Sequence, residues 1–152
     1  MEKVIDIWYI LRTIGLTIVF VGLIGFERQR KHKIAGLTTH ILVALGAAGI
    51  TLVQEMMVQD AIAFVRENPE FAGNIMLERQ RIIAQIITGV GFLGAGAILK
   101  TNGYITGLTT ASSLWISAII GIIFGAGYTM LGIILSISAL IVLTIIKGVF
   151  GT

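Results

Sequence analysis

The chain has 152 residues, is 56% hydrophobic and only 12% charged, and carries a formal net charge of +3. Soluble domains are about a quarter charged, and a soluble fold of this size cannot hide so much apolar surface in one core. The composition therefore excludes an ordinary soluble protein and, with no cysteine in the sequence, also disulfides and thiol chemistry.

Five apolar stretches predict spanning helices, in chain order Ile7–Phe26, Ile34–Val53, Ile82–Leu99, Gly107–Phe124 and Tyr128–Ile146. Each is close to the ~20 residues that a helix needs to cross the hydrocarbon layer. Lipid also favours helices because their backbone groups pair within the segment. We expect an all-α, polytopic membrane protein with five transmembrane helices, forming a single domain over residues 1–152.

The connections between these stretches differ in length and charge. Glu27–Lys33 is short and basic, Lys100–Thr106 is short with one charge, and Gly125–Gly127 is a tight turn. Gln54–Arg81 is a long loop of mixed charge, which Asn68-Pro69 divides in two. The part before this break is expected to form a short helix at the membrane surface.

The basic residues predict the orientation of the chain. Cytoplasmic loops carry an excess of Lys and Arg, so the loop Glu27–Lys33 is placed in the cytoplasm. Lys100 and Lys147 then lie on the same side. The N-terminus and the long loop lie outside, and the C-terminus is cytoplasmic.

The segment GLTT occurs twice, at Gly36–Thr39 and at Gly107–Thr110. A helix end rich in glycine precedes each copy, GLIGF before the first and GFLGA before the second. Both helix pairs run outside–inside–outside, so the sequence predicts a parallel two-helix repeat about an axis along the membrane normal. The fifth helix lies outside the repeat.

Both GLTT segments place threonines at helix starts, where unpaired backbone N–H groups carry partial positive charge. Our hypothesis is that Glu27 binds the donor-rich pole formed by these helix starts and by Arg28. The alternative is that the threonines only cap the helices. A lone histidine in such a position is more often a packed ring than a ligand. The predicted cytoplasmic-face site consists of Glu27, Arg28, Gly36, Thr38, Thr39, His40, Lys100, Thr109 and Thr110.

The segment GVGFLG, Gly89–Gly94, matches the pattern G-x-G-x-x-G. A dinucleotide site would need a strand before it and a helix after it, and this segment lies inside an apolar helix. Close helix packing is the expected role of the small residues, with local unwinding of the third helix as the alternative. The predicted packing glycines are Gly22, Gly25, Gly91, Gly94 and Gly96.

Four polar residues are expected within the membrane or at its outer face: Arg12, Glu78, Arg81 and Gln85. Arg12 lies about one turn inside Trp8, and a charge within a membrane helix is a candidate functional site. The alternative is that Arg12 extends to the outer interface. Glu78, Arg81 and Gln85 share one helix face, where Gln85 either bonds another helix or anchors the interface.

The sequence predicts no metal site, no cofactor and no enzyme. Magnesium prefers several oxygen ligands, and the cytoplasmic face offers Glu27 alone, beside Arg28 and Arg30. The two histidines lack neighbouring carboxylates for zinc, and no nucleophile has a recognisable base. The basic loop is expected to meet anionic lipid head groups and not nucleic acid.

Three segments resemble the signatures of the MgtC/SapB family of bacterial inner-membrane proteins: 22–47, 81–100 and 107–121. The resemblance covers nearly all of the chain, and three signatures in order make it specific. Glu78 stands where the family usually has Asp. The family's positions fall on Gly22, Gly25, Glu27, Arg28, Ala35, Gly36, Leu37, Thr39, His40, Arg81, Gln85, Gly91, Phe92, Gly94, Gly96, Gly107, Leu108, Thr109, Thr110, Ala111 and Trp115.

The resemblance implies adaptation to low magnesium, acid or host stress, and virulence in pathogens. It implies a protein that modulates other membrane machinery, including the proton-translocating ATP synthase, and does not itself carry Mg²⁺. Longer family members have a soluble cytoplasmic domain after the last helix. The sequence ends at Thr152, so we expect the membrane domain without a C-terminal soluble domain.

Two function hypotheses follow. The first is a non-enzymatic modulator in the bacterial inner membrane that binds another membrane protein or lipid. The alternative is a small-solute or ion transporter, which the parallel repeat and an unwound third helix would serve. Self-association is expected as well, because the glycine-rich faces exceed what one five-helix bundle can bury.

Overall fold

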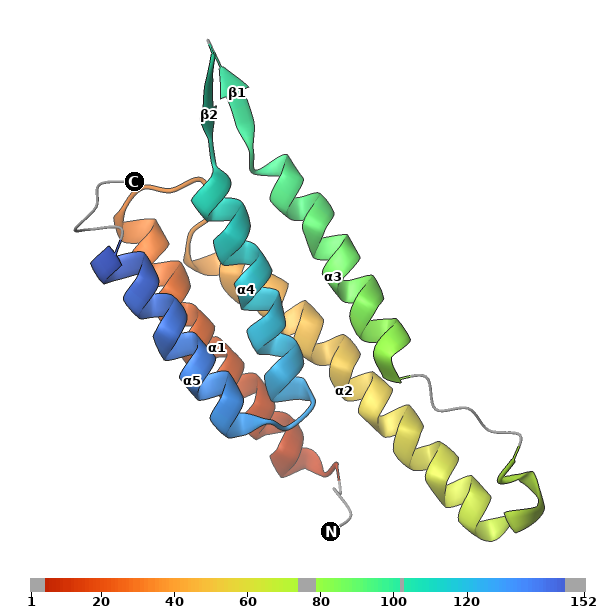
Figure 1. The fold of residues 1–152 in the computed structure, drawn as a ribbon. Coiled ribbons are helices and arrows are strands. Elements are labelled where there is room, and N and C mark those ends of the chain that lie inside the picture. Colours follow the sequence, from red (N-terminus) through yellow and green to blue (C-terminus); the bar gives the residue numbers. More distant parts are fainter. Residues whose placement is uncertain (1–4, 74–78, 102, 147–152) are drawn as a thin grey trace.

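The computed structural model describes residues 5–73, 79–101 and 103–146 (Figure 1). It contains five α-helices, so the predicted all-α class is confirmed. Four of them are long and apolar enough to cross a membrane: α1, α2, α4 and α5 with its continuation. The helices are α1 (Ile7–Arg30), α2 (Leu37–Glu67), α3 (Arg79–Gly96), α4 (Leu108–Gly125) and α5 (Thr129–Ile141), with a 3-10 turn at Pro69–Phe71 and a π-helical continuation of α5 at Val142–Ile146.

Several predicted boundaries were wrong, among them the end of α1, which continues past Phe26 to Arg30. α2 continues past Val53 to Glu67, so the first part of the predicted outer loop is helical. Residues 54–67 contain neither Gly nor Pro, and the helix ends only at Asn68-Pro69, where proline disfavours helical geometry in the preceding residue. α3 ends at Gly96, and the expected loop Lys100–Thr106 lies within an antiparallel hairpin of β1 (Leu99–Thr101) and β2 (Tyr104–Thr106).

α2 and α4 cross at small residues. Gly121 and Gly125 lie one turn apart on α4, and the backbone of α2 passes directly over them. A Cβ atom at Gly121 would collide with the carbonyl oxygen of Ala44, and one at Gly125 would lie 2.9 Å from that of Ala48. Close approach of small residues is a main source of helix association in lipid, where apolar burial contributes little. The crossing makes α4 the centre of the bundle, in contact with the other four helices.

The interior of the bundle contains hydroxyl groups that bond within the protein. The side chains of Thr17 and Thr51 each donate to a carbonyl oxygen one turn earlier in their own helix, at 2.8 Å. The Tyr9 hydroxyl donates to the carbonyl oxygen of Gly125 at 3.0 Å, which joins the start of α1 to the end of α4. These bonds satisfy buried polar groups without water, as a lipid environment requires.

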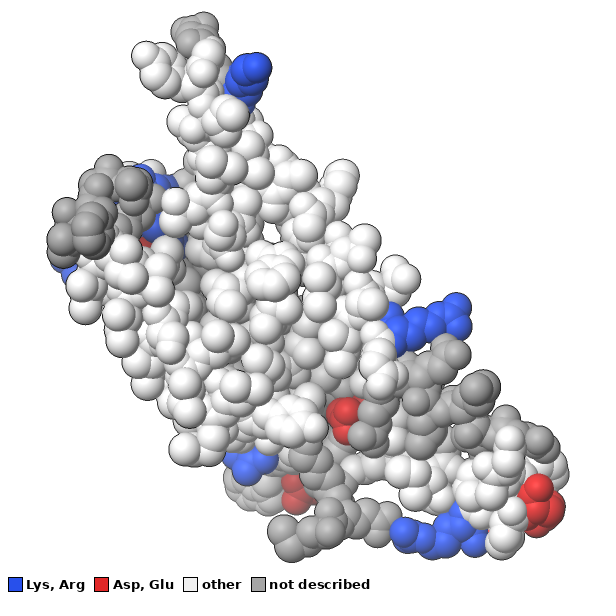
Figure 2. Space-filling model, in the orientation of Figure 1, with Lys and Arg blue, Asp and Glu red and all other residues white. Residues whose placement is uncertain are grey.

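The two ends of the molecule differ in composition from its middle. One end, which we call the GLTT end, contains the α1–α2 turn, the hairpin and the starts of α2 and α4 (Figure 1). In Figure 2 the side chains of the middle are uncharged, and the coloured charges lie toward the two ends. Large apolar side chains such as Val19, Ile134 and Phe92 are exposed in this middle band. An exposed apolar surface of this extent suits a protein surrounded by lipid.

The helix pairs α1–α2 and α3–α4 run in the same sense, toward the GLTT end and back (Figure 1). Each pair approaches at the glycine that precedes its turn. Gly25 faces Leu37 and His40 on α2, and Gly94 faces Ala111 on α4. Ala111 follows the second GLTT as His40 follows the first, so the two pairs cross at corresponding positions.

Candidate functional site

The GLTT end contains a buried ionic cluster, formed by the last turn of α1. Arg28 is completely buried and Glu27 is 8% exposed. The Arg28 guanidinium lies 3.5 Å from one carboxylate oxygen of Glu27, and the ammonium of Lys31 contacts the other. The contact with Lys31 lacks hydrogen-bond geometry, but the attraction between opposite charges does not depend on that angle. Two cations therefore surround one carboxylate.

The cluster is attached to α5 and leaves one donor unused. Lys31 Nζ also donates to the carbonyl oxygen of Leu143 at 3.2 Å, which ties the α1–α2 turn to the π-helical continuation of α5. The Nε atom of Arg28 is buried and has no hydrogen-bond partner among the described residues. A buried charge is costly unless it is paired, so Glu27 is required to keep Arg28 inside the protein.

His40 lies beside this cluster and links α2 to α4. It is completely buried; its Nδ1 lies 2.7 Å from the carbonyl oxygen of Gly36, and its Nε2 lies 2.9 Å from Ser113 Oγ. A carbonyl only accepts, so Nδ1 carries a proton. Ser113 Oγ is also 2.9 Å from the carbonyl oxygen of Thr110, and its one hydrogen serves either acceptor. His40 is thus a packed, hydrogen-bonded ring.

Glycines occupy the N-cap positions of α2 and α4, Gly36 and Gly107, and neither N-cap residue makes a side-chain cap hydrogen bond. The threonines of the two GLTT segments follow within the first turn of each helix. The cap of α2 comes from α1, because Gln29 Oε1 accepts a hydrogen bond from the Leu37 backbone N–H at 3.1 Å. Gly107 adopts a left-handed φ of 89°, which glycine adopts without strain.

The structure brings together only part of the predicted cytoplasmic-face site. Glu27, Arg28 and His40 are buried next to one another, and Thr110 joins them through Ser113. Thr38 and Thr39 are exposed, Thr109 is half-buried, and Lys100 is exposed on the hairpin. The contact between Glu27 and Arg28 is as expected, whereas bonds from the helix starts to Glu27 are not observed among the described residues.

The packing glycines divide into two groups. Gly22, Gly25 and Gly94 face side chains or backbone of a neighbouring helix, as expected. A Cβ atom at Gly91 or Gly96 would meet no atom within 4 Å, so neither packs against the residues that the structure describes. α3 is continuous through Gly96, and the alternative of an unwound segment at Gly91–Gly96 is not observed.

Three of the four predicted outer-face residues are described by the structure, and they lie toward the end opposite the GLTT end. Arg12 is exposed with its guanidinium 5.4 Å from the Tyr9 ring centre, which fits the interface interpretation and not a buried site. Arg81 and Gln85 are exposed on α3 and line one groove with α2. Glu78 lies outside the described residues.

Two partners in the site could not be read from the sequence around it. Ser113 is 73 residues from His40, and in the sequence it is one serine in an apolar helix. Gln29 is one polar residue in a basic loop.

The sequence analysis also did not single out Gln54 of α2. Its side chain is 3% exposed, and its Oε1 has no hydrogen-bond partner among the described residues. The polarity of such residues was a signal that could have identified them, because polar side chains within spanning helices face the protein interior.

The described residues contain no group of three or more His, Asp or Glu side chains placed to hold a metal ion. The cluster at the GLTT end offers one carboxylate that two cations already neutralise. Such a site repels a further cation. Its arrangement instead fixes the α1–α2 turn, with Arg30, Lys31 and Lys33 on the exposed surface.

The fold, the apolar middle and the buried ionic turn define a multi-pass α-helical membrane protein. The profile of the MgtC family matches residues 14–150, and the chain belongs to that family.

Similar proteins have 40–42% identical residues. YhiD of Escherichia coli (strain K12) is 41% identical over 90% of this chain and 60% of its own length. MgtC of Brucella abortus (strain 2308) is 42% identical over 70% of this chain and 38% of its own. SapB of Bacillus subtilis (strain 168) is 40% identical over 80% of this chain and 51% of its own length. The chain therefore spans 38–60% of the length of these relatives. No solved structure matches.

Proposed function

We propose that the protein is a non-enzymatic modulator in the bacterial inner membrane, which supports adaptation to low magnesium, acid or host stress by contacting another membrane protein. Membership of the MgtC family supports this role. The name of the relative YhiD assigns it provisionally to magnesium transport, which agrees with a link to magnesium. In this proposal the GLTT end faces the cytoplasm, because the α1–α2 turn is its most basic segment.

The observation that carries the proposal is the closed ionic cluster. Glu27 and Arg28 are paired and buried, and His40 is bonded on both ring nitrogens. Groups held in this way stabilise one geometry of the α1–α2 turn and do not exchange ligands with passing ions. A fixed turn suits recognition of a partner, because little conformational entropy is lost on binding.

The contact surface in this proposal is the exposed part of the same turn. Arg30 and Lys33 are exposed on a backbone that the buried cluster holds, and Lys31, which belongs to the cluster, is partly exposed beside them. Arg30 also lies over the ring of Phe26, with 5.9 Å between the guanidinium carbon and the ring centre. A positive surface beside exposed apolar side chains fits an acidic cytoplasmic segment of a second membrane protein.

Growth in low magnesium tests this role. A strain without the chromosomal gene is complemented with the wild type, with the double variant Arg30→Gln/Lys33→Gln, or with Lys100→Gln. The double variant removes two exposed charges of the turn, and Lys100→Gln removes an exposed charge from the hairpin at the same end. We expect loss of growth for the double variant alone, at equal amounts of folded protein in the membrane. Full growth with the double variant would contradict the proposal.

The alternative function is transport of an ion or small solute. The parallel arrangement of the two helix pairs and the name of YhiD favour it. A transporter needs a polar path across the bilayer. The buried hydroxyls of Thr17, Thr51 and Ser117 each bond within their own helix, which argues against such a path in this conformation. Flux through the purified protein separates the two functions.

A further inference from the structure

The outward face of α3 is not covered by the rest of the bundle. α3 lies at the edge of the molecule, where it packs mainly on α4 and less on α2 (Figure 1). On the side away from these helices, Phe92 is 81% exposed, more than any other large apolar side chain of the described residues. The segment from Ile82 to Gly96 contains no charged residue, so this face lies in the apolar middle of the molecule.

A hollow of about 440 Å³ lies beside this face, between α3 and α4. Gly91, Gly94 and Ala95 of α3 line it, together with residues of α4 that include Trp115. A Cβ atom at Gly91 would meet no described atom within 4 Å. The small residues of α3 therefore leave room for an apolar group from outside the described chain.

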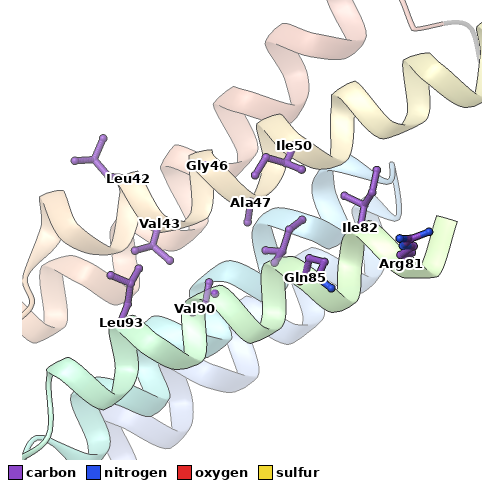
Figure 3. A pocket seen from close by; sticks show the side chains of 12 residues that line it. Leu42, Val43, Gly46, Ala47, Ile50, Arg81, Ile82, Gln85, Val90 and Leu93 are labelled. Atoms are coloured by element: carbon purple, nitrogen blue, oxygen red, sulfur yellow. The ribbon is translucent and has the colours of Figure 1, made fainter. Parts of the chain in front are cut away.

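The ring and the hollow lie on opposite flanks of the same helix face. At about 100° per residue, Thr88 and Ala95 fall near the middle of the exposed face. Gly91, with the hollow, lies about 50° toward α4. Phe92 lies about 50° the other way, on the side where Gln85 lines the groove between α2 and α3 (Figure 3). The face thus has a projecting ring on one flank and a cavity on the other.

Such a face is complementary to itself across a two-fold axis. Copies of one chain enter a membrane in the same orientation, so two α3 helices that meet across an axis along the membrane normal run parallel. The ring flank of each copy then faces the hollow flank of the other, and the same contact forms twice. Phe92 and Gly91 are neighbours in the sequence, so the ring and the hollow lie at nearly the same depth.

Gln85 adds a polar requirement to this face. Its side chain is exposed in the charge-free segment and makes no hydrogen bond with the described residues. Lipid tails would fill the hollow but would offer this amide no partner, whereas amide side chains in membranes bond to neighbouring helices. Thr88, near the middle of the face, donates its hydroxyl to the carbonyl oxygen of Ala84 at 2.9 Å. The Oγ1 atom of Thr88 in a second copy can still accept a bond from Gln85.

The contact area also suits a dimer. One ring buries about 150 Å², so two rings and the walls of two hollows account for about 600 Å² in total. α3 is about 27 Å long, and the rest of its face supplies the remainder of the roughly 1,200 Å² that the smaller stable interfaces bury.

We propose that two copies of this chain associate through the outward face of α3, with Phe92 of each copy in the hollow beside Gly91 of the other. The interface lies within the membrane and does not include the α1–α2 turn. Each dimer therefore presents the basic turn twice.

Two glycines of α3 provide a matched test of the hollow. A Cβ atom at Gly91 or at Gly89 would meet no described atom within 4 Å, but Gly89 lies on the side of α2 and not in the hollow. Gly91→Leu therefore fills the hollow without displacing described atoms, and Gly89→Leu is the control. The sequence contains no cysteine, so Lys100→Cys on the exposed hairpin provides a single labelling site.

Copies labelled with donor or acceptor fluorophores are mixed in phosphatidylcholine liposomes, and energy transfer is measured as lipid dilutes the protein. Circular dichroism confirms that each variant is helical. We expect the parent Lys100→Cys protein and Gly89→Leu to dimerise equally well. Gly91→Leu is expected to raise the dissociation constant at least about tenfold.

The ring and the amide are tested in the same assay. We expect Phe92→Ala to weaken the dimer about tenfold, whereas Phe26→Ala, which removes an exposed phenylalanine of α1, leaves it unchanged. Gln85→Leu should weaken it about eightfold through the loss of two amide contacts. A parent protein that stays monomeric at every dilution would overturn the proposal. So would equal dimerisation of Gly91→Leu and Gly89→Leu, or a dimer that Phe92→Ala or Gln85→Leu leaves unchanged.

Discussion

The helix pairs α1–α2 and α3–α4 share a crossing point but differ in what they enclose there. The first pair buries Glu27, Arg28 and His40 at its turn. The second pair has Ala111 at the position of His40 and carries Lys100 on an exposed hairpin. The repeat therefore contains the same arrangement of helix backbones twice, and buried charged side chains occur at the turn of the first pair. Variants at corresponding positions of the two pairs test this difference.

The largest contrast is expected at the N-cap glycines. Gly107→Ala places a side chain at a φ of 89° and against the carbonyl oxygen of Ala97, so we expect a loss of about 4 kcal/mol from strain and overpacking. Gly36→Ala meets the flexible side chain of Gln29 at 3.1 Å and is expected to cost about 1 kcal/mol. Reversible unfolding in mixed micelles measures both. Equal losses would contradict the assignment of Gly107 as the strained position.

Removal of the buried carboxylate of Glu27 is expected to cause the next largest loss in the free energy of unfolding. Glu27→Gln leaves the guanidinium of Arg28 inside the protein without an ionic partner, at a cost of about 3 kcal/mol in the free energy of unfolding. Lys100→Gln, the control at the other turn, is expected to change it by at most about 0.5 kcal/mol. A Glu27→Gln protein as stable as the control would show that Arg28 is not held by this pair.

The glycines at the two crossings are expected to respond with opposite signs. A Cβ atom at Gly25 would lie 2.8 Å from the Cα of Leu37, whereas one at Gly94 would lie 3.6 Å from its nearest neighbour on Ala111. Gly25→Ala should therefore destabilise by about 2 kcal/mol. Gly94→Ala should stabilise by up to about 1 kcal/mol, since alanine favours a helix over glycine. A loss of stability in both variants would mean that the second pair is packed as tightly as the first.

The smallest contrast compares neighbouring serines of α4. Ser113→Ala removes the partner of His40 Nε2 and is expected to cost about 1 kcal/mol. Ser112 is exposed, and its hydroxyl donates to the Leu108 carbonyl of its own helix, so Ser112→Ala should be close to neutral. Unfolding of both variants in the same micelles provides the measurement. Equal free energies of unfolding for the two variants would show that the bond between His40 and Ser113 does not stabilise the α2–α4 contact.

Apolar length predicts the helices well, because a segment in lipid must satisfy its own backbone. Each of the five predicted stretches overlaps one helix of the structure. The ends were harder to place. α2 continues through a polar stretch to Glu67 because polarity does not end a helix, and Asn68-Pro69 does. The hairpin after α3 has too few residues to show an alternating pattern.

The sequence named nine residues for the cytoplasmic-face site, and the structure brings only part of them together. Glu27, Arg28 and His40 were among the nine and lie next to one another. Their burial, and the bond of His40 to Ser113, depend on how α4 packs across α2. The cap of α2 by Gln29 is of the same kind, because it joins residues eight positions apart across the α1–α2 turn.

Flux in sealed liposomes tests the central claim most directly, that the closed cluster supports a partner surface and not an ion path. The purified, folded protein is reconstituted, and entry of Mg²⁺ is measured with a trapped indicator, beside Glu27→Gln, Lys100→Gln and protein-free liposomes. The account predicts that every sample matches the protein-free liposomes. Mg²⁺ entry through the wild type and Lys100→Gln, abolished by Glu27→Gln in a folded state, would contradict it and establish the transporter.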